Sequence, residues 1–187
     1  MRRIQSVYLA GPNVHLEQAL SLAATARALC EAAGFSALTS KPDLLTEVEP
    51  SEAMAREIYA TRAARMRQAD AGIVDLSPFR GPHCNPDAAF EAGFIAGLGK
   101  PVFAYMNVPS EAEAELCSRV LAHGYAELDS EGVWRDGDGF EIEDFGLPES
   151  VMLWAEARRI FVIVSPDVRS DLTGLQLCLD ALKMYVD

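Results

Sequence analysis

The sequence predicts an α/β protein built on a doubly wound parallel sheet of five strands with helices on both faces. Short apolar runs of strand length alternate with longer segments of helical periodicity, which is the order of elements that a parallel sheet requires. Residues 71–76 are mostly apolar, as expected of a strand that is covered on both faces. A chain of 187 residues has the length of one domain, so we expect a single domain over residues 1–187.

The elements of the first half follow from apolar runs and turn residues. Residues 4–10 are predicted to form a strand that ends in Gly-Pro-Asn, and residues 15–33 an Ala- and Leu-rich helix that a glycine stops. Residues 36–39 have the pattern of a short second strand. After a polar loop, Ser51 begins a helix that extends to about Ala69 and carries a basic stripe, which is usually a solvated face.

The second half continues the alternation. A loop over residues 77–87 precedes a helix at 88–98, whose large side chains Phe90, Phe94, Ile95 and Leu98 are expected to face the core. The later elements are a strand at 102–105, an acidic helix at 110–123, a polar stretch at 129–144 resembling a small ribbon, a helix at 148–157, a strand at 159–164 and a helix at 170–186. Residues from about 107 to 144 are therefore predicted to form a surface insertion.

The charge of the chain limits the class of partner. A formal net charge of -12 opposes binding to a nucleic acid polymer or an anionic membrane, so a small-molecule ligand is favoured. No apolar run approaches about 18 residues and the first residues lack an apolar export signal, which predicts a cytoplasmic protein. The 4 cysteines and 3 histidines lack metal-ligand spacing, so neither disulfides nor a metal site is predicted.

A single carboxylate is the strongest functional signal. Glu91 lies in the apolar helix that follows the Gly/Pro-rich loop. In open parallel sheets the ligand crevice lies beyond the carboxyl ends of the strands, so the loop after Asp75 and the start of the next helix should line it. Glu91, one turn into that helix, would point into the crevice. The alternative is an ordinary solvated glutamate, which the helix dipole favours near an N-terminus.

The end of the first predicted strand supplies a candidate partner for this carboxylate. The segment YLAGP places the phenol of Tyr8 at a strand end, beside Gly11 and Pro12 in a turn where a glycine lets a ligand approach the backbone. A phenol there could hydrogen-bond a carboxylate. A third segment, FGLPESVML at residues 145–153, is a turn and helix start with polar residues beside a Met/Leu pair.

Together, the segments YLAGP, DLSPFRGPHCNPDAAFEAGFIAGLGKP and FGLPESVML resemble the nucleoside 2-deoxyribosyltransferase family, in matching order and over most of the chain. The resemblance implies a flavodoxin-like, Rossmann-like three-layer α/β/α sandwich, with Glu91 as the catalytic nucleophile and Tyr8 as the tyrosine that orients it. It implies cleavage of the N-glycosidic bond of a 2'-deoxynucleoside through a covalent 2-deoxyribosyl-Glu91 and transfer of the sugar to another nucleobase with retention. It implies no cofactor, and a homo-oligomer with shared active sites.

Three positions depart from the family pattern. Asn85 stands where the family often has an aspartate that holds the sugar 5'-hydroxyl, and Arg62 stands where an Asp or Asn contacts or protonates the departing base. Arginine stays charged and so is no acid catalyst, although it binds base carbonyls and phosphates. Ser150 occupies a place commonly held by an Asn that reaches across a subunit interface to the neighbour's sugar.

The remaining candidate substrate contacts are Gly11, Pro12, Asp75, Phe79, Arg80 and Asp87. The neighbourhood of Phe79 and the loop at residues 39–49 would form the base pocket. Arg80 either contacts a phosphate or ties its loop to backbone carbonyls, and the multiple-donor chemistry of arginine favours the second role.

Two other functions stay open beside transfer. Neutral side chains at Asn85 and Ser150 would suit a 5'-phosphate, so a nucleoside 5'-monophosphate N-glycosidase, with the same nucleophile and with water as acceptor, is the main alternative. The other is a nucleotide-binding α/β protein without catalysis, because a fold alone does not guarantee activity.

Overall fold

The computed structural model describes residues 4–39 and 50–185, and it contains the five-stranded parallel sheet that the sequence predicts. The strands are β1 Ser6–Ala10, β2 Ser36–Thr39, β3 Ala71–Asp75, β4 Val102–Val108 and β7 Arg159–Val164. Their order is β2-β1-β3-β4-β7, and each neighbouring pair is parallel. The chain changes direction across the sheet between β1 and β3, so the topological switch point lies at the carboxyl ends of these two strands.

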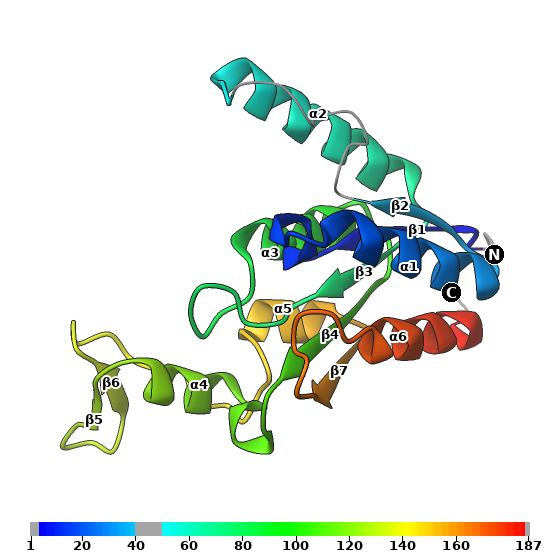
Figure 1. The fold of residues 1–187 in the computed structure, drawn as a ribbon. Helices are drawn as coiled ribbons and strands as arrows, with labels where there is room; N and C mark the ends of the chain where they lie inside the picture. The colour runs from blue at the N-terminus through cyan, green and yellow to red at the C-terminus, as the bar shows by residue number, and fades with distance from the viewer. Residues whose placement is uncertain (1–3, 40–49, 186–187) are drawn as a thin grey trace.

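Helices cover both faces of the sheet and complete three layers (Figure 1). On one face lie α1 Ala19–Ala32 and α6 Thr173–Met184, and on the other lie α2 Glu52–Gln68, α3 Pro86–Gly97 and α5 Val151–Glu156. The helix predicted from residue 15 begins later, because a 3-10 turn, η1 Pro12–His15, precedes α1. The predicted loop at 41–49 lies outside the described residues.

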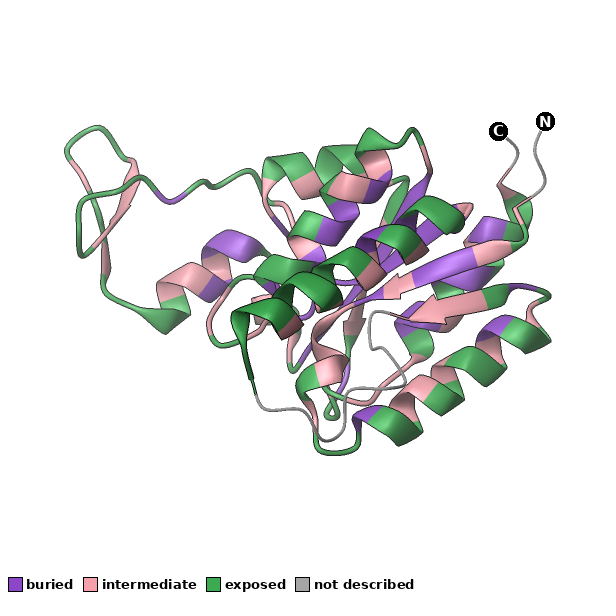
Figure 2. Cartoon of the chain, turned by 90° about the horizontal axis from the view of Figure 1, so that it is seen from above, coloured by how far each residue is buried: buried purple, intermediate pink, exposed green. Residues whose placement is uncertain are grey.

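The central strands form the core of the molecule. Every position of β3 and β4 is buried, and exposed residues concentrate on the outer sides of the helices (Figure 2). Neighbouring positions alternate between the faces: Tyr8 and Val74 belong to the cluster under α2 and α3, whereas Val7 and Ile73 belong to the cluster under α1 and α6. This alternation, which has a period of two residues, sends the Tyr8 side chain toward α3.

The face of α3 that meets the sheet differs from the predicted one. Its buried residues are Ala88, Glu91, Ala92 and Ile95. The prediction was wrong for Phe90 and Leu98, which are 55% and 41% exposed. Small residues allow α3 to lie close to the sheet, since a Cβ added at Gly72 of β3 would stand 2.8 Å from Cδ1 of Ile95. The large rings are therefore displaced from this interface, and Glu91 lies on the inner face of its helix.

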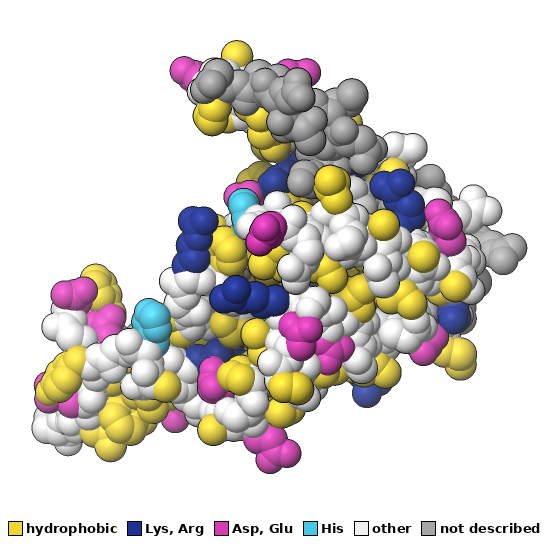
Figure 3. Space-filling view, in the orientation of Figure 1, with side chains coloured by type: hydrophobic (Ala, Val, Ile, Leu, Met, Phe, Trp, Pro, Cys, Tyr) yellow, Lys and Arg dark blue, Asp and Glu magenta, His cyan; other side chains and the backbone are white. Residues whose placement is uncertain are grey.

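The predicted insertion at 107–144 is only partly a surface feature. Its outer end is an antiparallel ribbon of β5 Ala126–Leu128 and β6 Trp134–Asp136, which projects from the body and gathers hydrophobic and acidic side chains (Figure 3). The predicted helix at 110–123 is divided into η2 Glu111–Glu113 and α4 Leu116–His123, because Glu115 is extended. The inner part, α4, buries Arg119 among other residues.

One helix is anchored by few residues. α2 buries only Ala63 and Met66 among its 17 residues, and its N-terminal half projects away from the sheet (Figure 1). Ser51 caps it, as predicted, by accepting a hydrogen bond from the backbone N–H of Met54. No helix within the described residues is both long and apolar enough to cross a membrane.

Candidate active site

Tyr8 and Glu91 meet beneath the carboxyl ends of β1 and β3. The Tyr8 hydroxyl donates to Oε1 of Glu91 over 2.7 Å, and the two residues are 0% and 3% exposed. Burial is the main reason that the pKa of Tyr8 is raised above its usual range, so the phenol stays protonated and remains a donor. The glutamate is thus a buried, oriented carboxylate, and the solvated alternative is wrong.

The start of α3 is fixed by a side-chain cap. Oδ1 of Asn85 accepts hydrogen bonds from the backbone N–H groups of Asp87, over 2.7 Å, and Ala88, over 3.3 Å, and Pro86 occupies the first turn. The helix dipole acts most strongly in the first turn of a helix. Because this helix begins at Pro86, Glu91 lies beyond its first turn. Asp87 occupies the first turn instead, so the helix dipole stabilises the charge of Glu91 only weakly.

The charge of Glu91 is set by opposing influences. Burial raises the pKa of the Glu91 carboxyl above its usual value. The Tyr8 hydrogen bond and the positive charge of Arg62 lower this pKa, while Asp87 raises it. Nη1 of Arg62 lies 2.8 Å from Oδ2 of Asp87 and 3.7 Å from Oε1 of Glu91. Arg62, predicted as a substrate contact, is therefore also an electrostatic partner of the carboxylate.

An open hollow of about 410 Å³ adjoins this group and has the size of a small-molecule site. Its lining comes from α2, α3 and η1, and consists of His15, Ala55, Ile58, Tyr59, Arg62, Met66, Asp87, Phe90 and Glu91. Sequence reasoning missed His15, Tyr59 and Phe90. Tyr59 and Phe90 are separated by 31 positions and only the packing of α2 on α3 pairs their rings, with centroids 6.4 Å apart.

Gly11 and Asp75 contact each other at the switch point. A Cβ on Gly11 would lie 2.6 Å from Cβ of Asp75, so the lack of a side chain at residue 11 makes room for the aspartate. Oδ1 of Asp75 accepts from the backbone N–H of Ser77 over 2.9 Å and from its hydroxyl over 2.5 Å. Burial raises the pKa of Asp75 to about 6. Neither residue lines the hollow beside Glu91, and neither does Pro12.

The loop after β3 carries an aromatic stack. The ring of Phe79 lies 5.3 Å from that of His15 and 4.7 Å from the guanidinium carbon of Arg80, which is exposed. Arg80 has a φ of 55°, in the left-handed region. The expectation that Arg80 ties the loop to backbone carbonyls was wrong, because the described structure assigns it the ring contact and no carbonyl. Phe79 does not line the hollow beside Glu91 itself, but its ring packs on His15, which does.

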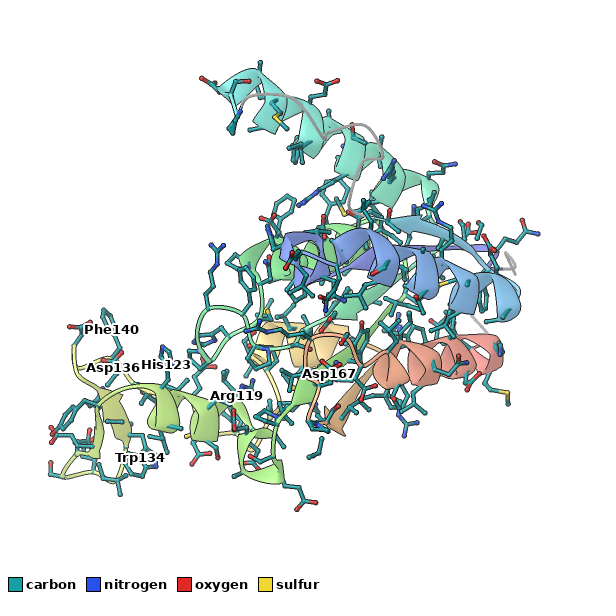
Figure 4. The ribbon with its side chains drawn as sticks, in the orientation of Figure 1. Arg119, His123, Trp134, Asp136, Phe140 and Asp167 are labelled. Atoms are coloured by element: carbon teal, nitrogen blue, oxygen red, sulfur yellow. The ribbon has the colours of Figure 1, made fainter. Side chains whose placement is uncertain are left out.

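A different arginine, Arg119, connects separate segments through hydrogen bonds to backbone carbonyls. Arg119 of α4 projects toward the body of the molecule (Figure 4), where its side chain donates to the carbonyl oxygens of Glu113, Ala114, Pro82 and Pro148. Beside it, the buried carboxylate of Glu149 accepts from the backbone N–H groups of Cys84 and Ser150. A weak signal for Arg119 existed in the sequence, since it lies three positions after Leu116, on the apolar face of its helix.

Comparison with known proteins adds an independent observation. A family model described as nucleoside 2-deoxyribosyltransferase matches residues 7–152, a range that includes Tyr8, Glu91 and Ser150. The chain belongs to this family.

Three relatives place this family member among known structures and sequences. A 2-desoxiribosyltransferase from Leishmania mexicana shares the fold with a TM-score of 0.62 at 24% identity, covering 94% of this chain and 97% of that one. A conserved protein from Enterococcus faecalis V583 has a TM-score of 0.55 at 14% identity, with 98% and 99% covered. An uncharacterised protein of Schizosaccharomyces pombe is 27% identical over 159 residues, which are 80% of this chain and 75% of that one.

The structure brings together part of the predicted site. Tyr8, Arg62, Asp87 and Glu91 surround one position, and Asn85 supports the helix that carries two of them. Ser150, at the N-terminus of α5, does not line the hollow in this single chain.

Proposed function

We propose that the protein is a nucleoside 2-deoxyribosyltransferase that cleaves the N-glycosidic bond of a 2'-deoxynucleoside and transfers the sugar to a second nucleobase. The observation that carries the proposal is the 2.7 Å hydrogen bond from Tyr8 to Glu91 at the side of an open hollow. A buried carboxylate oriented by a permanent donor, with space beside it for a ligand, suits nucleophilic attack on a sugar carbon.

The chemistry needs one ionised carboxylate. An oxygen of Glu91 forms a bond to the anomeric carbon through an oxocarbenium-like transition state, and the bond from that carbon to the base nitrogen breaks. The electron pair leaves with the base, which takes up a proton from water. A nitrogen of the incoming base then attacks the same carbon, releases Glu91 as a carboxylate and loses a proton. Two inversions give retention of configuration.

The neighbours of Glu91 have separate roles in this proposal. Tyr8 holds one oxygen, and Arg62 favours the ionised state from 3.7 Å while Asp87 fixes the guanidinium from 2.8 Å. Arg62 does not protonate the base, because a guanidinium stays charged. The aromatic side chains Tyr59 and Phe90, 53% and 55% exposed at the hollow, offer apolar surface for a planar nucleobase.

A single chromatographic assay tests the function. The protein is incubated with a 2'-deoxynucleoside, or with the matching 5'-monophosphate, together with a different free base. We expect a new deoxynucleoside that contains the added base, and no product from Glu91→Ala. Free base released mainly from the monophosphate, without an exchange product, would replace this proposal with 5'-monophosphate hydrolysis. No turnover of either substrate would favour a nucleotide-binding protein without catalysis.

We also propose that the active form is a homo-oligomer with shared sites. Next to Ser150, the helix α5 exposes apolar side chains that its own chain leaves uncovered, with Met152 81%, Trp154 48% and Val151 37% exposed. Large exposed apolar side chains gathered on one helix are typical of a protein interface. Light scattering after size exclusion should give at least a dimer, and Met152→Glu should dissociate it and abolish transfer. A monomer with full activity would refute the shared site.

A further inference from the structure

The insertion and the loop before Glu91 share a buried charged centre. Arg119 of α4 and Glu149 have side chains that are each 2% exposed, and Nη2 of Arg119 lies 3.9 Å from Oε2 of Glu149. A buried pair of this kind is retained only where its hydrogen bonds are satisfied, since removing a charge from water is unfavourable. Both groups meet this condition through the backbone.

The arginine joins three segments. Its Nε donates to the carbonyl of Pro82 over 2.8 Å, its Nη2 to that of Pro148 over 2.6 Å, and its Nη1 to those of Glu113 and Ala114 over 2.8 and 3.3 Å. Pro82 belongs to the loop between β3 and α3, and Pro148 immediately precedes Glu149. A planar guanidinium with five N–H donors suits such a junction, and a lysine ammonium is a poorer substitute.

The glutamate joins two of the same segments from the other side. Oε2 of Glu149 accepts from the backbone N–H of Cys84 over 3.2 Å, and Oε1 accepts from that of Ser150 over 2.9 Å. Cys84 directly precedes Asn85, whose side chain caps the helix of Glu91. One carboxylate therefore lies between the N-terminus of α3 and the N-terminus of α5, and it fixes their separation.

We propose that Arg119 and Glu149 are positioning residues, through which the insertion sets the distance between the Asn85 cap of the Glu91 helix and Ser150. The assignment of a catalytic purpose rests on the proposed function, because Asn85 and Ser150 are the candidate sugar contacts. The bracing of the loop itself does not rest on it. In this proposal the part of the insertion that positions the loop is α4, which carries Arg119.

Thiol labelling tests the bracing without any assay of activity. Cys84 is 7% exposed in the braced loop. Cys30 of α1 and Cys178 of α6 are both 0% exposed and belong to the core cluster on the opposite face of the sheet. Arg119→Met is treated with iodoacetamide at fixed pH, and the rate at each cysteine is followed by peptide mass. We expect Cys84 to react at least 10-fold faster than in the unmodified protein, with Cys30 and Cys178 unchanged.

The direction of the change in the Cys84 labelling rate distinguishes an opened loop from the mere loss of the Arg119 charge. The positive charge of Arg119 lowers the pKa of the Cys84 thiol, which burial and Glu149 raise to about 12. Removal of Arg119 alone would therefore raise that pKa and slow the reaction of Cys84, since the thiolate is the reactive form. Faster labelling that is confined to Cys84 therefore indicates an opened loop and not the loss of the charge. Equal acceleration at all four cysteines would instead indicate global destabilisation and would overturn the proposal, as would unchanged labelling of Cys84.

Two further variants keep the test decisive. If Arg119→Met does not fold, Arg119→Gln, which removes the same charge but keeps a polar side chain and leaves Glu149 in place, should show the same selective labelling of Cys84. Arg119→Lys should restore slow labelling only in part. The matched control is Arg135→Met, which removes an arginine of the same insertion that pairs with Asp129 over 2.7 Å in the ribbon and should change nothing.

Kinetics then test the catalytic purpose separately. In the unmodified protein, turnover of a deoxynucleoside must first be observed, and its absence would refute the proposed function while leaving the labelling result valid. Given turnover, Arg119→Met should raise KM for the deoxynucleoside at least 10-fold. A fall in kcat that only follows the folded fraction, with KM unchanged, would show a purely structural pair.

Discussion

The Tyr8 hydroxyl donates a hydrogen bond to Oε1 of Glu91 over 2.7 Å, although 83 positions separate the two residues in the chain. The pairing depends on the sheet order, because β1 and β3 are neighbours and α3 lies over both. Each residue alone has an ordinary explanation as core tyrosine or helical glutamate. In contact, they form a buried carboxylate with a fixed orientation.

Tyr8→Phe should keep the fold and lower the rate of base release. The ring still fills its core position, but the carboxylate loses one charged hydrogen bond, which is worth about 1.5–3 kcal/mol and corresponds to roughly a 10- to 100-fold fall in kcat. Because the Tyr8 bond also lowers the pKa of Glu91, the acid limb of the pH profile should move to higher pH. An unchanged rate would show that Tyr8 does not orient the nucleophile.

Glu91→Gln should abolish turnover and stabilise the fold at neutral pH. The pKa of Glu91 is raised in the folded state, so the folded protein holds this proton more tightly than the unfolded chain does. The resulting contribution to stability is present below the unfolded pKa and is lost as pH rises through the folded pKa. Above both values glutamine avoids this loss, and the gain should disappear below about pH 4. Thermal melts at several pH values measure it, and a lower melting temperature at pH 7 would contradict it.

Arg62→Met should shift the acid limb of activity toward higher pH. The guanidinium is one of two influences that lower the pKa of Glu91, and its removal leaves the carboxylate harder to ionise. Rates of base release from pH 4 to 8 would show the shift. Arg56→Met, at an exposed pair on the same helix, is the matched control and should leave the profile in place. Equal profiles for both variants would remove Arg62 from the electrostatics of the site.

Gly11→Ala should destabilise the protein, while Gly97→Ala should not. A Cβ at residue 11 would lie 2.6 Å from Cβ of Asp75 at a φ of 155°, whereas a Cβ at residue 97 of α3 meets no atom within 4 Å. Overpacking of this kind destabilises by about 1–3 kcal/mol. Urea unfolding of the two variants measures the difference. Equal midpoints would mean that the contact between Gly11 and Asp75 relaxes freely.

The sequence predicted the alternation of elements, the parallel sheet and the pair of Tyr8 and Glu91, since these follow from local periodicity and from motifs. It failed where the outcome depends on contacts between distant segments. On α3, residue size suggested that Phe90 faces the core, yet close approach to Gly72 selects the small residues for that face. Arg119 was overlooked because four backbone carbonyls, which leave no trace in a side-chain pattern, make its burial favourable.

One wall of the hollow is a helix that contributes little to the core. Ala55, Ile58, Tyr59 and Arg62 all come from α2, whose only buried residues are Ala63 and Met66. Local opening of the N-terminal part of α2, residues 52–62, should therefore require less free energy than global unfolding. The backbone amides of this part should exchange with deuterium early. A ligand held between α2 and α3 would add its binding free energy to that local equilibrium. Slowed exchange over residues 52–62 would thus report occupancy of the site even in a variant that has lost its nucleophile.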